Sequence, residues 1–129
     1  MREERKVRLR NSKKSKILRS VLVFCLILIF AALFWWLVMH LREREARSFL
    51  IQAIESINKQ TDFYKKHSER EALENIEEYK DVITNNYTIT CHYDTWSEYD
   101  YEVVFDRSYG FYVTIQRKKG SLVISDFFE

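Results

Sequence analysis

Residues Val21–Met39 read VLVFCLILIFAALFWWLVM, an unbroken apolar run without a charged side chain. At about 1.5 Å per residue, a helix formed by this run is about 28 Å long, close to the ~30 Å hydrocarbon core of a bilayer. In lipid, a single segment satisfies its backbone hydrogen-bonding groups only as a helix. The run therefore predicts one transmembrane helix over residues 21–39.

The two flanks of this run differ in charge. Residues 1–20 contain nine Lys and Arg against two Glu, a net charge of +7, whereas the rest of the chain has a net charge of −5. Basic flanks stay in the cytoplasm, and only Arg42, Arg44 and Arg47 oppose that signal from the far side. We therefore expect residues 1–20 to be a basic cytoplasmic tail and residues 40–129 to form a domain outside the cell membrane.

The ends of the apolar run carry residues that suit a membrane interface. Arg19 precedes the run, and Trp35 and Trp36 lie near its far end, where indole rings favour the headgroup region. The run is longer than the apolar core of a cleaved signal peptide and lacks a small-residue cleavage site, which favours an uncleaved, single-pass signal anchor. Beside such a helix, the basic tail is interpreted as a topology signal that attracts anionic lipid, and we expect no nucleic acid partner.

Two helices are expected at the start of the outer domain. Apolar residues keep helical spacing beyond His40 without a helix breaker, so the first helix should continue to about Ile57. Thr61-Asp62 can start a short extra turn. Ser68 and Glu71 match a capping box, which predicts a second helix from about Glu69. The side chains expected on the buried sides are Leu41, Phe49, Leu50, Ala53, Ile54 and Ile57 in the first helix, and Leu73, Ile76, Tyr79 and Ile83 in the second.

From residue 87 the apolar period changes to two, which is typical of strands with one buried face. The short connections between these segments require antiparallel neighbours. We therefore expect an α+β fold class: a single N-terminal transmembrane helix, then a small two-layer domain of two helices and a four-stranded antiparallel meander sheet. The expected strands are Tyr87–Tyr93, Tyr101–Asp106, Phe111–Gln116 and Ser121–Phe128, with a turn at Lys119-Gly120.

The chain lacks the residue patterns of familiar catalytic and metal sites. The histidines are dispersed, the cysteines have no zinc-site spacing, and two glycines do not form a phosphate-binding loop. Cys91 and His92 are adjacent, so in a strand they point to opposite faces and do not form a nucleophile–base pair. We interpret Cys91 as a small core residue, with an intermolecular disulfide as the alternative. We therefore expect no enzyme activity, no catalytic, metal or cofactor-binding residues, and no small-molecule substrate.

Acidic and aromatic residues alternate between positions 94 and 102. This run is best interpreted as a solvated turn, and next as a recognition surface for a basic partner. A calcium site ranks a distant third, because its loop pattern is missing. The second interpretation defines a possible partner surface. Its residues are Trp96, Glu98, Tyr99, Asp100 and Tyr101.

Two functional hypotheses fit these features of the sequence. The first is a membrane-anchored protein whose small extracytoplasmic domain is a binding or assembly module for another membrane or envelope protein. The alternative is a small regulatory subunit that acts through its transmembrane helix. A folded outer domain favours the first, since a regulator made of one helix does not need a sheet. The expected partners are therefore the lipid bilayer and another membrane or envelope protein.

The charge difference predicts the topology. Reporter fusions at residue 10 and at residue 129 should report cytoplasm and exterior respectively, because the basic flank precedes the apolar run. Activity of the reporter at residue 129 in the cytoplasm would contradict this orientation. A mature N-terminus beyond residue 30 would show that the segment is cleaved.

Overall fold

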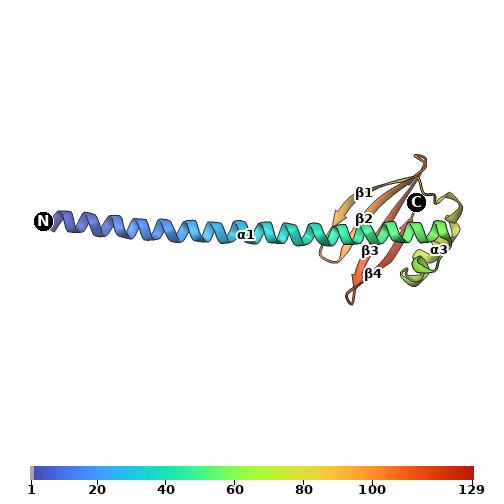
Figure 1. Cartoon of the computed structure of the whole chain (residues 1–129), viewed down its shortest axis with the longest axis horizontal. Coiled ribbons are helices and arrows are strands. Elements are labelled where there is room, and N and C mark those ends of the chain that lie inside the picture. The colour runs from blue at the N-terminus through green and yellow to red at the C-terminus, as the bar shows by residue number, and fades with distance from the viewer. Residues whose placement is uncertain (1) are drawn as a thin grey trace. The chain divides into compact units, whose positions relative to one another are not determined.

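The computed structural model describes the backbone of residues 2–129, together with the side chains of residue 8 and of residues 10–129. The basic side chains predicted in the tail at positions 2, 5 and 6 therefore lie outside the described side chains. Figure 1 shows a long first helix followed by short helices and a sheet. The elements are α1 (Arg2–Lys59), α2 (Phe63–Lys66), α3 (Arg70–Glu78), the 3-10 helix η1 (Lys80–Val82), β1 (Tyr87–Asp94), β2 (Glu98–Phe105), β3 (Tyr109–Lys118) and β4 (Ser121–Phe128).

The chain divides into two compact units, Met1–Val38 and Met39–Glu129. Within residues 10–59, α1 is long and apolar enough to cross a membrane by length and composition, with a mean hydropathy of 3.0 in its most apolar window. None of that window is buried, whereas a long apolar helix in a soluble protein is usually a core element. The long apolar N-terminal helix expected from the sequence is thus confirmed.

The sheet is a meander in the order β1-β2-β3-β4, with each strand antiparallel to its neighbour. This confirms the predicted order and direction of the strands. The β3–β4 turn is built at Lys119 and Gly120, which have φ values of 52° and 79°. A positive φ suits glycine, which has no Cβ to clash with the backbone, so the position of this turn follows from the sequence.

The core of the second unit lies between one face of the sheet and the last part of α1, which crosses that face (Figure 1). Ala46 and Ala53 of α1 are fully buried in this core. Arg117 of β3 also ties the two layers together, donating from Nη2 to Glu45 Oε2 at 3.0 Å. The predicted apolar stripe of the first helix is confirmed except for Leu41, which is exposed.

The first helix ends at Lys59, where Gln60 adopts a left-handed conformation with φ 58°. Buried Ser56 then fixes the reversal of the chain: its hydroxyl donates to the Ala53 carbonyl at 2.7 Å and accepts the Tyr64 amide at 3.1 Å. The short helix α2 follows Asp62, as the sequence predicts.

The predicted capping box at Ser68 and Glu71 is wrong. Helix α3 begins at Arg70 with Glu69 as the N-cap, and no side chain caps it. The Ser68 hydroxyl instead donates to the Tyr64 carbonyl, and the Glu69 amide donates to Ile124 of β4 at 2.9 Å. Pairing with the edge of the sheet has replaced the local cap. Of the side chains predicted to be buried, Ile76 and Ile83 are buried, and Leu73 and Tyr79 are partly buried.

Replacement of Ile76 tests the buried side of α3. Ile76 is fully buried, so Ile76→Asp places a carboxylate in the core at a cost of several kcal/mol, on the order of the whole stability of a small domain. We expect the fragment of residues 40–129 with this substitution to lose its cooperative thermal transition by circular dichroism. Glu71→Asp, at an exposed position of the same helix, should leave the transition within a few degrees of the parent. An unchanged transition in Ile76→Asp would show that the buried face is assigned wrongly.

Candidate functional site

Side chains of β2 point alternately into the core and away from it, so the residues of the predicted partner surface lie on two different faces of the sheet. Tyr99 and Tyr101 are both 0% exposed and point into the core, so their assignment to a contact surface is wrong. Their hydroxyl groups are satisfied inside the domain. Tyr101 donates to the Glu43 carbonyl oxygen at 3.1 Å, and Tyr99 donates to the Trp96 carbonyl oxygen at 3.3 Å. Burial raises the pKa of Tyr101, which keeps the phenol protonated as a donor.

The acidic residues of the predicted surface lie on the opposite face of the same strand. Side chains alternate along a strand, so Glu98, Asp100 and Glu102 point outward and are partly exposed. Thr114 donates to Asp100 Oδ1 at 2.9 Å, and the His92 ring lies 2.7 Å from Glu102 Oε2. These contacts hold carboxylates from a central strand in fixed positions on the uncovered side of the sheet.

Two exposed aromatic rings lie beside these carboxylates. Strand register places Glu102, Tyr112 and Phe128 in one row across β2, β3 and β4. Tyr112 and Phe128 are 44% and 45% exposed and stack with their centroids 5.4 Å apart. The His92 ring is 6.1 Å from the ring of Tyr112. We define the outer face by Glu98, Asp100, Glu102, His92, Tyr112 and Phe128.

Sequence reasoning missed the aromatic half of this outer face. In the expected strand Phe111–Gln116, the alternate residues Phe111, Val113 and Ile115 are buried. Tyr112 and Phe128 fall in the outward sets of their strands, where an exposed sheet face usually carries polar residues. Large aromatic residues at outward positions were the signal that could have identified the face.

Trp96 belongs to a different part of the domain. The connection from β1 to β2 comprises only residues 95–97, so it is shorter than the connection over residues 94–100 that the expected strands left between them. The ring is 45% exposed, and the Arg42 guanidinium carbon lies 3.7 Å from its centroid. Arg42 Nε also donates to the Trp96 carbonyl oxygen at 3.3 Å. Trp96 therefore lies at the end of the sheet contacted by α1 soon after the apolar run.

Cys91 and His92 are adjacent in β1 but differ in their surroundings. Cys91 packs against the core and His92 faces outward, which confirms that the two point to opposite faces. Burial raises the pKa of the Cys91 thiol, with a further contribution from Glu43, so the reactive thiolate is disfavoured. Among the residues with described positions, no group of three or more His, Cys, Asp or Glu could hold a metal ion.

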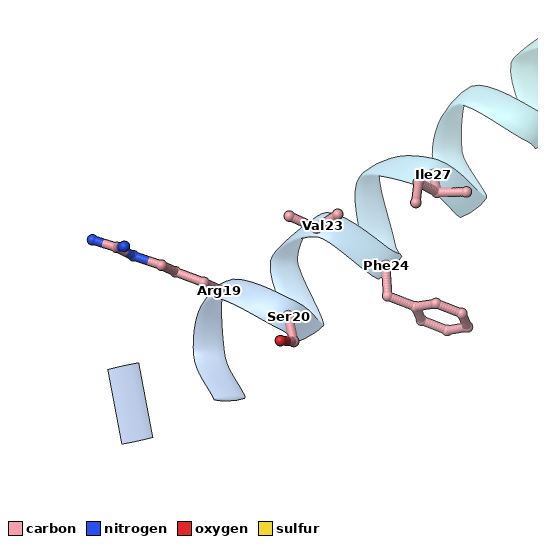
Figure 2. Close-up of a pocket in the computed structure, with 5 residues that line it drawn as sticks. All are labelled: Arg19, Ser20, Val23, Phe24 and Ile27. Atoms are coloured by element: carbon pink, nitrogen blue, oxygen red, sulfur yellow. The ribbon is translucent and has the colours of Figure 1, made fainter. Parts of the chain in front are cut away.

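The apolar helix carries the residues predicted for the membrane interface. Arg19, Trp35 and Trp36 are exposed on α1. Figure 2 shows a hollow beside Arg19 whose labelled lining residues all come from this one helix, with Phe24 pointing away from Arg19. A hollow between side chains of a single helix is a shallow surface depression, and it encloses no ligand site.

The outer face of the second unit presents both charged and aromatic groups. It combines partly exposed carboxylates with two stacked aromatic rings. Aromatic rings are enriched at protein–protein interfaces, whereas carboxylates act there mainly through charge complementarity. Comparisons with protein families, with curated proteins and with solved structures found no match to this chain.

Proposed function

We propose that this chain is a single-pass membrane protein whose small extracytoplasmic domain binds another membrane or envelope protein. The contact is made through the outer face of the sheet, and it is a binding contact without catalysis. The observation that carries the proposal is the stacked, exposed pair Tyr112 and Phe128 beside the carboxylates of β2.

The membrane anchor in this proposal is the apolar run Val21–Met39. Its side chains are exposed to the surroundings of the helix over the whole most apolar window. Exposed apolar area costs about 25 cal/mol per Å² in water, so a helix of this composition is stable only when lipid or another apolar surface covers it. The basic residues before the run support a cytoplasmic N-terminus and a sheet domain outside.

The partner in this proposal presents a basic surface. Glu98, Asp100 and Glu102 form one acidic line along β2, and carboxylates select complementary positive charge and suppress acidic competitors. The Tyr112 and Phe128 rings supply the contact area, since aromatic residues have few rotatable bonds and dominate binding energies at interfaces. Together the two features suit a basic patch with an apolar centre.

The partner also lies close to the membrane. The first buried residue of the domain, Ala46, follows Met39 by seven positions, a distance of at most about 25 Å along an extended chain. The domain therefore stays near the bilayer whatever path the chain takes between the two residues. A membrane protein or a protein held at the same surface is within its reach.

Removal of the two exposed rings tests this function. Tyr112→Thr combined with Phe128→Thr keeps strand-forming residues on the sheet and removes the aromatic contact. Loss of two interface aromatics weakens binding by about 2 kcal/mol or more, or about 30-fold. Loss of a cross-strand pair changes stability by only about 0.2–1 kcal/mol. We therefore expect co-purification of the partner in mild detergent to be lost while the thermal midpoint falls by only a few degrees.

The matched control is Glu71→Gln combined with Glu74→Gln, which alters exposed residues of α3 on the helical side of the domain. This variant should retain the partner. Recovery that survives loss of both rings would contradict the proposal. Exchange of Val21–Met39 for an unrelated apolar helix tests the rival function. Loss of partner recovery on that exchange, with recovery intact in the ring variant, would assign the function to regulation through the membrane helix.

A further inference from the structure

Two exposed aromatic rings lie at the end of the sheet where α1 enters the domain: Trp96 in the β1–β2 turn and Tyr93 near the end of β1. Because the strands form an antiparallel meander, the β1–β2 turn and the β3–β4 turn at Lys119–Gly120 lie at this same end. The Arg117 amide donates to the Ser97 carbonyl at 2.7 Å, which joins the two hairpins there. Trp96 is thus held in place by the sheet as well as by Arg42.

Chain connectivity places this end near the end of the apolar run. Arg42 follows Met39 by three positions on α1, a rise of about 4.5 Å along the helix. The Trp96 ring centroid lies 3.7 Å from the Arg42 guanidinium carbon. If Met39 is at the edge of the hydrocarbon core, Trp96 is within reach of the headgroup layer, which adds about 5–8 Å on each side of a bilayer.

The side chains at this end suit that layer. Tyr93 is 55% exposed, Trp96 is 45% exposed, and rings of these two types favour the membrane–water interface. Arg44 and Lys119 are exposed cations that match lipid phosphates. The nearest helix carboxylates already have partners, since Glu43 pairs with Arg47 and Glu45 pairs with Arg117, as ion pairs of 3.2 and 3.0 Å.

Acidic residues limit the electrostatic part of such a contact. Asp94 and Glu98 flank the turn, so its net positive charge is small and the rings must supply most of the attraction. An indole ring with an adjacent guanidinium is suited to this role, because the apolar body faces the acyl chains while the cation faces phosphate.

We propose that the β1–β2 turn is a second membrane contact, with Trp96 and Tyr93 in the headgroup layer and Arg44 and Lys119 directed to lipid phosphates. The proposal rests on the membrane anchor of the proposed function, and it adds that the folded domain itself touches lipid. It leaves the outer face of the sheet available to a protein partner.

Depth-dependent quenching of Trp96 fluorescence tests this contact. The full chain with Trp35→Phe and Trp36→Phe retains Trp96 as its single tryptophan. This chain is reconstituted into vesicles of phosphatidylcholine and phosphatidylglycerol. A fraction of the lipid molecules carries a nitroxide on the headgroup. The matched control adds Trp96→Phe and Tyr109→Trp, which moves the indole to an exposed site beside the opposite turn of the sheet.

We expect the headgroup nitroxide to quench Trp96 at least about twofold more strongly than the indole at position 109, because interfacial rings lie at headgroup depth. Equal quenching of the two indoles, in chains that float with the vesicles, would overturn the lipid contact alone. Failure of the chain to float would overturn the anchor of the proposed function and this inference with it. Because the vesicles contain no other protein, quenching cannot arise from a protein partner.

Discussion

The domain depends on one constraint: a four-stranded sheet with a single helical layer has only one covered face. The last part of α1 and helix α3 cover that face, and they contribute the fully buried Ala46, Ala53 and Ile76 to the core. Strand side chains alternate, so each residue directed into this core requires its neighbours to face away. The burial of Tyr99 and Tyr101 and the exposure of the carboxylates beside them are two results of the same packing.

Those parts of the fold that depend on local periodicity could be predicted from the sequence. The change of period from helix to strand at residue 87, the turn at Lys119-Gly120 and the buried stripe of α1 are all visible in one dimension. The tyrosines of β2 were misplaced because acids alternating with aromatic rings fit an exposed turn as well as a strand. The partner of the Tyr101 hydroxyl, the Glu43 carbonyl, is 58 residues away in sequence. No local pattern reveals such a partner.

The failure at Ser68 has a similar cause. A serine followed three residues later by glutamate favours a capped helix in isolation, but residues 67 and 69 exchange backbone hydrogen bonds with Ile124. This pairing also covers the middle of β4, which is otherwise an edge strand open to association. Tertiary pairing that protects an edge therefore decided the local geometry. The pairing of Tyr112 with Phe128 depends on the register shift between Thr114 and Ile115, an irregularity that the sequence pattern does not reveal.

Two parts of the domain surface are suited to two different environments, a protein partner and the lipid headgroups. The outer face combines acids and rings in fixed positions and suits a basic protein, whereas the end marked by Trp96 suits lipid headgroups. The most direct measurement is site-specific photocrosslinking in the native membrane, with Tyr112 or exposed Glu74 replaced by benzoylphenylalanine in the full chain. We expect a discrete crosslinked protein from position 112 and none from position 74. The same adducts from both positions, or none from position 112, would contradict the assignment of the outer face as the partner-binding surface.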